Sequence, residues 1–455
     1  MVDRLLIQGL GLLNSTTPPQ EGTNAVVVCD GLVEKIGDGS KLEREYGPDR
    51  VLDYPNGILM PGLVNSHTHS VQAFLRGAAE DLSLLDWLNQ VILPGEATMT
   101  AEEVYASSLL GYMDLVSHGT TFANDMLTVR HTEAGLRAGR DIGVRARVGK
   151  MLMDDGRIPS LLRQETTEAL EESHHLIEGW HKQTPLIDYS LNPRFLLTCS
   201  AELMRGCAHL MEEHPGVGFH THANENREET RLAKKIHGRP YIEALHHYGT
   251  LSPQSVIAHG IWLEPREQQI LAETQTGVVH NPSANAKLAS GVCDWPGLQQ
   301  QGVRVGLGTD GPPCNNTMDL FREMRLACFL QRISKLDETV APAHQVFGLA
   351  TFEGARMLGR PDLGQLKEGF PADLLVLDVG SPDHWPLHDY LAHVVFRATG
   401  EDVTSTFVAG TMVYNKQGKT VDEQFPRVPP GTVPTVLARA RKYMVDKPWL
   451  TRDPN

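Results

Sequence analysis

The sequence lacks three features that would direct it to nucleic acids, membranes or export. It has no basic excess, since 41 Lys and Arg face 56 Asp and Glu, giving a formal net charge of −15 over 455 residues. That balance argues against nucleic acid or an anionic membrane as a partner, because both select a basic face. No window approaches about 18 uninterrupted apolar residues, and the first residues contain no apolar signal region, so we expect a cytoplasmic protein without a transmembrane helix.

Cysteine is also scarce, and the few copies present form no pattern. None of the six belongs to a Cys-x-x-Cys pair, so the sequence predicts neither a disulfide framework nor a structural zinc knuckle. No Gly-x-Gly-x-x-Gly follows an expected strand and no Walker loop occurs, which disfavours the nucleotide-phosphate folds. Histidine, by contrast, is abundant: there are twenty, several of them at the ends of apolar runs.

Both ends of the chain have strand-like patterns, and in the middle strand-like runs alternate with helical patterns. Residues 1–58 and 366–455 contain short apolar segments with Gly and Asp-Gly turns, and we expect them to form one small β-sandwich, with a helix near the end of the chain. Residues 59–365 alternate strand-like runs with helical patterns, which predicts an α/β protein built on a (β/α)₈ TIM barrel. The eight expected barrel strands are Leu59–Val64, Thr120–Ala123, Ala146–Val148, Ile187–Leu191, Val217–Phe219, Ser255–Ala258, Gly277–Val279 and Val303–Gly306.

Chemically useful side chains follow these strands. In a barrel of this kind the working residues lie at the C-terminal ends of the strands, and residues i and i+2 of one strand share a face. Each such residue could be structural on its own, but a run of them at successive strand ends indicates a functional site. In strand order the series is His67 and His69 after the first, His220, His222 and Glu225 after the fifth, His259 after the sixth, His280 after the seventh and Asp310 after the eighth.

These donors predict a metal site. Imidazole nitrogens and a carboxylate suit a borderline divalent ion such as Zn²⁺, and Fe²⁺ also fits. The fourth strand end supplies Arg194 but no lysine or carboxylate that could bridge two metals, and a guanidinium cannot bind a cation. We therefore expect one metal per subunit, held by His67, His69, His222 and Asp310, with water in the open position.

Three side chains near the expected metal could handle protons and charge. A bound metal lowers the pKa of water towards about 7, and Asp310 could accept the proton that this water releases. Glu225, three residues after His222, could protonate the substrate, while His259 could stabilise developing charge. Together they predict hydrolytic attack on an electrophilic carbon.

Several motifs of this sequence resemble one family. They are "PGLVNSHTH", "HTHANE", "IAHG", "HNPSAN", "GTDG" and the later "GQLKEGFPADLLVLD", which look like the amidohydrolase superfamily, in its cytosine, guanine and methylthioadenosine deaminase and triazine hydrolase branch. The resemblance covers essentially the whole chain. It implies a barrel with a composite β-sandwich, one catalytic zinc, and replacement of an exocyclic amino group on an aromatic N-heterocycle by hydroxyl, with release of ammonia. A homodimer or larger homo-oligomer is expected for such a barrel.

The substrate segments point in two directions. Gln72, Arg194 and Phe195 resemble guanine deaminases, in which the arginine reads a ring carbonyl and the phenylalanine stacks on the ring. Trp87 and Glu96 resemble methylthioadenosine/S-adenosylhomocysteine deaminases, in which they contact the nucleoside. With His280 these six form the expected substrate-binding set. Guanine or a related aminopurine is the best single candidate, with a nucleoside deaminase or an s-triazine hydrolase as alternatives and a non-catalytic scaffold as a remote one.

Overall fold

A parallel β-barrel forms the centre of the computed structural model, which describes residues 4–14, 22–78, 80–156 and 162–447. Eight strands pair in parallel in the order β13-β12-β11-β10-β9-β7-β6-β5, and an isolated parallel bridge between Thr68 and Asp310 brings the last strand next to the first. This confirms the expected TIM barrel. Its strands are β5 (Leu63–Thr68), β6 (Thr120–Met126), β7 (Arg145–Gly149), β9 (Ile187–Pro193), β10 (Gly218–Ala223), β11 (Ser255–His259), β12 (Gly277–His280) and β13 (Arg304–Leu307), with the short β8 (Met151–Leu152) beside β9.

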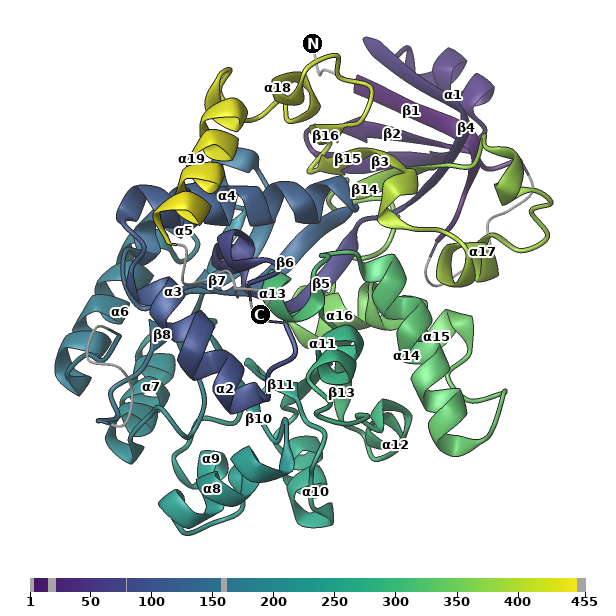
Figure 1. Ribbon diagram of the computed structural model, residues 1–455. Helices are drawn as coiled ribbons and strands as arrows, with labels where there is room; N and C mark the ends of the chain where they lie inside the picture. Colours follow the sequence, from purple (N-terminus) through teal and green to yellow (C-terminus); the bar gives the residue numbers. More distant parts are fainter. Residues whose placement is uncertain (1–3, 15–21, 79, 157–161, 448–455) are drawn as a thin grey trace.

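Helices surround the barrel because its strands are apolar and buried on both faces (Figure 1). The longest, α4, begins at a capping box. The Thr100 hydroxyl accepts a hydrogen bond from the backbone N–H of Glu103, and the Glu103 carboxylate accepts one from the backbone N–H of Thr100. The helices that follow the strands are α4 (Ala101–Ser117), α5 (Thr132–Ile142), α6 (Thr166–Trp180), α7 (Ala201–Glu213), α8 (Arg227–His237), α9 (Tyr241–His247), α10 (Pro265–Glu273), α11 (Pro282–Lys287), α12 (Trp295–Gln300), α13 (Pro312–Asn315), α14 (Leu320–Lys335), α15 (Ala343–Leu349) and α16 (Phe352–Met357).

The two ends of the chain build a second β unit beside the barrel, at the upper right of Figure 1. It is one seven-stranded sheet that curls until Val33 N–H donates to the carbonyl of Phe370 at 2.8 Å. The two layers of the expected sandwich are therefore parts of a continuous sheet around an apolar core. The strand order is β16 (Thr411–Asn415), β15 (Val403–Val408), β14 (Leu374–Asp378), β4 (Arg50–Pro61), β1 (Arg4–Leu12), β2 (Ala25–Cys29) and β3 (Leu32–Gly37), antiparallel except for β1 with β4.

The first barrel strand differs from the expected Leu59–Val64. Leu59, Met60 and Pro61 pair with β14 in the terminal sheet, and the barrel strand starts only at Leu63. Between them the chain crosses at Gly62, where a Cβ would lie 2.1 Å from Oγ1 of Thr121. The apolar run conceals this change of sheet, because both strands are buried there. The domain boundaries at residues 59 and 366 stay predictions.

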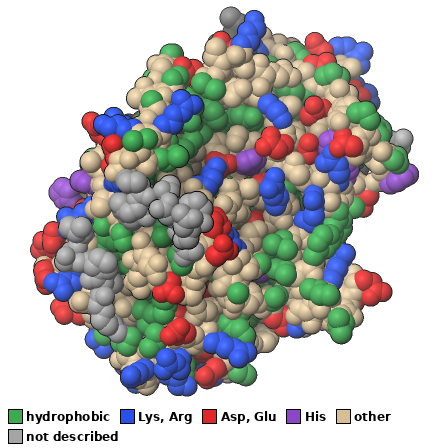
Figure 2. All heavy atoms as spheres, viewed as in Figure 1, with side chains coloured by type: hydrophobic (Ala, Val, Ile, Leu, Met, Phe, Trp, Pro, Cys, Tyr) green, Lys and Arg blue, Asp and Glu red, His purple; other side chains and the backbone are tan. Residues whose placement is uncertain are grey.

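The remaining helices cover the terminal sheet and the mouth of the barrel. The last, α19 (Thr432–Asp446), is the expected terminal helix and packs on α4 (Figure 1). Among the described residues, none of the helices has the length and apolarity needed to cross a membrane. On the face in Figure 2, acidic and basic side chains are interspersed. The other helices are α1 (Gly39–Tyr46), α2 (Leu84–Trp87), α3 (Leu93–Ala97), α17 (Tyr390–Phe396) and α18 (Val421–Gln424).

Candidate active site

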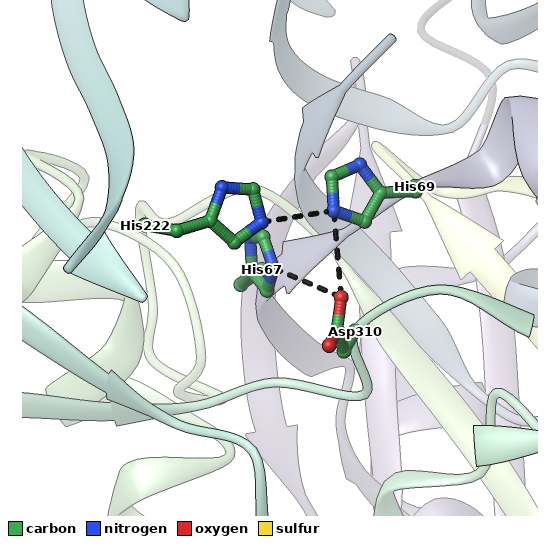
Figure 3. A group of neighbouring side chains, drawn as sticks. All are labelled: His67, His69, His222 and Asp310. Atoms are coloured by element: carbon green, nitrogen blue, oxygen red, sulfur yellow. Dashed lines mark hydrogen bonds and ion pairs between the residues drawn. The ribbon is translucent and has the colours of Figure 1, made fainter. Parts of the chain in front are cut away.

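Four side chains from three barrel strand ends meet at the C-terminal mouth of the barrel (Figure 3). His67 and His69 come from β5 and the residue after it, His222 from β10, and Asp310 from the loop after β13. One ligand atom from each lies within 4.8 Å of all the others. Nε2 of His69 is 3.2 Å from Nε2 of His222, and Oδ1 of Asp310 is 3.1 Å from Nε2 of His67 and 3.4 Å from Nε2 of His69.

The hydrogen bonds behind these rings show that the cluster suits a cation. Nδ1 of His69 donates to the carbonyl of Met126 at 2.9 Å, and Nδ1 of His222 donates to the carbonyl of Arg194 at 2.7 Å. With the ring protons on Nδ1, the two Nε2 lone pairs face each other and the carboxylate. Such backbone partners are the usual outer contacts of metal-bound histidines. The donor set therefore fits a divalent ion of the borderline class.

Burial keeps these imidazoles neutral, as metal ligands must be. It lowers the pKa of His69 to about 3 and that of His222 well below its ordinary value, and the neighbouring His67 adds to both effects. Burial also opposes the charge of Asp310, but its hydrogen bond to His67 and the nearby imidazoles outweigh this and hold its pKa well below the usual range. At neutral pH the site thus presents neutral nitrogens and one carboxylate.

Glu225 and His259 lie beside this cluster. Nε2 of His259 is 3.6 Å from Oε2 of Glu225 and 3.9 Å from Oδ2 of Asp310, the oxygen that faces away from His67. Burial raises the pKa of Glu225, with the charge of Asp310 adding to the effect and His259 opposing it. For His259, burial opposes the charge, but the two carboxylates outweigh it and raise the pKa. Burial therefore favours the protonated form of Glu225, and the two carboxylates favour the protonated form of His259.

The backbone is strained where these side chains turn inward. The backbone φ angles of His259 and Asp310 are 77° and 58°. These values lie in the left-handed region, which residues other than glycine rarely adopt. Each such residue costs on the order of 1–3 kcal/mol and persists only where surrounding contacts hold it. Here Asp310 N–H donates to the carbonyl of His67, and Nδ1 of His259 donates to Oδ1 of Asn285. This backbone conformation directs the side chains of His259 and Asp310 towards each other at the site.

The site opens on a narrow cavity of about 20 Å³. It has room for about one water molecule, so a larger molecule fits only if the lining segments move. The Arg194 side chain, only 3% exposed, lines this cavity, and its Nη1 lies 3.6 Å from Oε1 of Glu96. The lining residues outside the ligand cluster are Leu84, Trp87, Leu88, Arg194, Phe195, Glu225, Glu229, His259 and Leu288.

Three of the expected substrate-binding residues lie behind the cavity lining. Nε2 of Gln72 donates to Oε1 of Glu96 at 2.8 Å, and both side chains are buried. His280 is fully buried, and within the described parts of the chain neither of its ring nitrogens has a hydrogen-bond partner. Trp87, Arg194 and Phe195 line the cavity itself. The substrate roles of all six stay predictions.

Sequence reasoning missed several supporting residues. Glu229 lines the cavity and its Oε2 accepts the backbone N–H of Glu225 at 3.0 Å, while Ser290 donates to Oε1 of Glu225 at 3.1 Å. His220, which the sequence already placed at the end of the fifth strand, also supports the cluster, since its Nε2 lies 2.8 Å from Nδ1 of His67. Two signals were available: Glu229 lies one helical turn after Glu225, and Asn285 belongs to the "HNPSAN" motif. Ser290 has no comparable signal.

Known proteins share this architecture. Residues 58–413 match the Amidohydrolase family. A 5-methylthioadenosine/S-adenosylhomocysteine deaminase of Nitratidesulfovibrio vulgaris is 36% identical over 93% of this chain and 93% of its own length. The structure of an adenosine deaminase from Xanthomonas campestris with bound zinc matches with a TM-score of 0.88 and 29% identity, covering 97% of this chain and 98% of that one. Guanine deaminase of Escherichia coli matches with a TM-score of 0.80 and 27% identity, covering 91% and 99%.

The matches extend over the barrel, the site and the terminal sheet together. The named relatives are all deaminases, and this chain is likewise a hydrolase that cleaves carbon–nitrogen bonds of cyclic amidines. The chain belongs to the amidohydrolase family.

Proposed function

We propose that this protein is a zinc-dependent aminohydrolase that deaminates an amino-substituted purine. One observation carries the proposal: three imidazole nitrogens and a carboxylate oxygen lie within 4.8 Å of one another, with the buried carboxyl group of Glu225 next to them. His67, His69, His222 and Asp310 would hold the ion. Zinc in such a site lowers the pKa of water towards about 7 and so supplies a nucleophile near neutral pH.

Residues of this chain then accept and donate the protons of the reaction. Oδ2 of Asp310 points towards His259, away from His67, and accepts the proton that the attacking water releases. Glu225 donates its proton to the ring nitrogen next to the amino-bearing carbon while the oxygen of water bonds to that carbon. His259 stabilises the charge that develops on the new oxygen. The carbon–nitrogen bond breaks as Asp310 passes its proton to the amino group, which leaves as ammonia. The new hydroxyl gives its proton to Glu225 and becomes the ring carbonyl oxygen, so both carboxyl groups return to their starting states.

For the substrate, the relatives favour an adenine nucleoside. The Nitratidesulfovibrio relative is a methylthioadenosine/S-adenosylhomocysteine deaminase and the Xanthomonas protein is an adenosine deaminase. Both cover nearly the whole chain, which supports adenosine or a 5′-modified adenosine as the first candidate. This is the alternative that the sequence motifs left open beside guanine.

Guanine is the second candidate, and Arg194 is the observation that favours it. The buried guanidinium lines the cavity, and its fixed donors suit a ring carbonyl, which guanine has and adenine lacks. Glu96, which the resemblance to nucleoside deaminases predicts to contact a nucleoside, is not among the lining residues, and its Oε1 lies 3.6 Å from Nη1 of Arg194. The structure of the Escherichia coli guanine deaminase supports the same candidate through its fold and 27% identity.

A substrate panel with the zinc-loaded protein tests the proposal. The panel contains adenosine, 5′-deoxyadenosine, methylthioadenosine, S-adenosylhomocysteine, guanine and an s-triazine, and ammonia release is measured for each. We expect release from the adenine nucleosides, while release from guanine alone would select the second candidate. Chloride or alkylamine release from the triazine would indicate a triazine hydrolase, and no release from any compound would refute the proposed function. A homo-oligomer and a cytoplasmic location stay predictions, the first tested by light scattering.

A further inference from the structure

A second group of metal-binding side chains lies on the outer helices of the barrel. It comprises His174 on α6, Glu213 at the end of α7 and His214 directly after it, whose ligand atoms lie within 4.8 Å of one another. The two helices pack against each other (Figure 1). None of the three residues lines the catalytic cavity. We propose that these residues bind a second divalent cation of the borderline class, such as Zn²⁺.

The spacing of the two imidazoles suits a shared ion. Nδ1 of His174 lies 3.0 Å from Nε2 of His214, close to the 3.2 Å between the two Nε2 atoms of His69 and His222 in the catalytic cluster. Ligands at about 2.0–2.1 Å from a tetrahedral zinc are themselves about 3.3 Å apart. A small outward shift of one ring therefore admits the ion without rearranging either helix.

The surroundings orient both rings for this role. Oε1 of Glu178, one turn along α6, is 3.5 Å from Nε2 of His174. This ion-pair distance favours a ring proton on Nε2, which leaves the Nδ1 lone pair directed at His214. A carboxylate behind a histidine in this way is a common support for a metal ligand. The backbone N–H of His214 donates to the carbonyl of Leu210 at 3.0 Å, which fixes this residue at the helix end.

The side chains of this second group are partly exposed, so an ion can reach them from solvent. The side chains of His174 and Glu213 are 42% and 45% exposed, so binding requires no opening of the fold, and water can complete the coordination. The competing arrangement is a hydrogen bond between two neutral rings, which needs no ion. The decisive quantity is therefore the number of ions bound per chain.

The test titrates zinc chloride into the full-length protein that already holds one equivalent of catalytic zinc. Calorimetry and elemental analysis after desalting should give a second equivalent in the wild type and only one in His174→Ala and in His214→Ala. Glu178→Gln should weaken the second equivalent by roughly 10- to 100-fold, as loss of an outer partner does elsewhere. A wild type that binds a single equivalent would overturn the proposal.

Controls separate this site from the catalytic one and from general surface binding. His175→Ala removes the exposed neighbour of His174 on the same helix and should keep both equivalents. Zinc beyond the first equivalent should raise the Tm of the wild type and of His175→Ala but not of His174→Ala, because an ion bound only to the folded state stabilises it. The turnover of His174→Ala should equal that of the wild type. Retention of the second equivalent in both alanine variants would refute the assignment.

Discussion

At the residue scale, Glu225 has different neighbours at its two carboxylate oxygens. Ser290 donates to Oε1 at 3.1 Å, whereas Oε2 lies 3.6 Å from Nε2 of His259. The first contact fixes the carboxyl group, and the second side is the one from which the proposed mechanism transfers a proton. Because the side chain is not one of the four clustered ligands, changing it separates proton transfer from metal binding.

Glu225→Gln should keep the metal and lose turnover, because an amide cannot donate and recover a proton. Loss of a positioned acid–base group lowers kcat by about 10²- to 10⁴-fold. The measurement is kcat for the best substrate of the panel, together with zinc content by elemental analysis. Glu228→Gln, an exposed residue in the same segment, should match the wild type in both. An unchanged kcat in Glu225→Gln would contradict the proton role.

Arg194→Ala should distinguish the two substrate candidates. If the guanidinium reads a ring carbonyl, KM for guanine should rise by about 10- to 100-fold, the value of a hydrogen bond to a charged group. KM for adenosine should change little, since adenine offers no carbonyl at that position. Kinetics with both substrates check this. A larger effect on adenosine than on guanine would exclude the guanine candidate.

At the scale of elements, one buried ion pair joins the barrel to the terminal sheet. Arg145 on β7 donates from Nε and Nη2 to both carboxylate oxygens of Asp373, at 2.9 and 3.0 Å, and both side chains are at most 4% exposed. Oδ1 of Asp373 also accepts the backbone N–H of Ala409 at 2.8 Å. The pair therefore holds the segments next to β14 and β15 against the barrel.

Arg145→Ala should lower the free energy of unfolding by about 3–5 kcal/mol, because it leaves the carboxylate of Asp373 buried without its partner. Urea unfolding followed by circular dichroism measures the change. The matched control is Arg140→Ala, which removes an exposed ion pair with Asp141 and should change stability by no more than about 1 kcal/mol. Equal effects of the two substitutions would show that the buried pair has no special role.

A pH-dependent contribution is expected at the C-terminal end of α4. Nδ1 of His118 lies 2.8 Å from Oδ1 of Asp114. Burial opposes both charges, yet the contact between them outweighs it, so the pKa of His118 is raised from 6.5 and that of Asp114 is lowered from 3.8. Arg76 adds to the shift of Asp114, and Asp319 adds to that of His118.

The sign follows from these directions. The raised pKa of His118 contributes stability that is fully present below pH 6.5 and is lost as the pH rises through the pKa of His118 in the folded protein. The lowered pKa of Asp114 contributes stability that is present above pH 3.8 and is lost as the pH falls through the pKa of Asp114 in the folded protein. His118→Gln should therefore cost about 1.5–3 kcal/mol at pH 5–6 and less at pH 9. Urea midpoints at the two pH values measure it, and a pH-independent difference would contradict the ion pair.

The sequence predicted elements and strand ends well, because barrel strands are apolar runs that end in polar side chains. All four ligand side chains lie where that pattern put them, although their roles as ligands stay predictions. It could not predict that Leu59–Pro61 belongs to the terminal sheet, since burial is the same on both sides of Gly62. Nor could it predict that Gln72 bonds to Glu96 behind the cavity, because that depends on side-chain directions across loops far apart in sequence.

At the scale of the whole molecule, the ligand cluster lies over the junction between the first and last barrel strands. Within the described residues, the sole β-bridge between these two strand regions is that of Thr68 with Asp310. It is supported by Thr68 Oγ1, which donates to the Asp310 carbonyl at 3.1 Å, and by Asn65 Nδ2, which donates to Thr309 Oγ1 at 2.7 Å. A metal held by His67, His69 and Asp310 would link the two edges directly.

Removing the metal should therefore loosen this junction first. After chelation, amide hydrogens of β5 and of residues 308–311 should exchange faster, while those of β7 and β9 on the opposite side of the barrel change little. Tm should fall and recover when one equivalent of zinc is restored. Hydrogen exchange with mass spectrometry and a thermal scan measure both effects. A uniform change over all strands would contradict the link.

Thr68 and Asp310, the two sides of that junction, are 242 positions apart in the chain. During synthesis, a chain that has emerged only as far as β12 carries His67, His69 and His222 but not Asp310. It cannot yet assemble the complete set of donors, nor can it close the barrel around them. Hydrolytic competence should consequently not arise before Asp310 has emerged, so a chain truncated ahead of that residue would not act on the substrate.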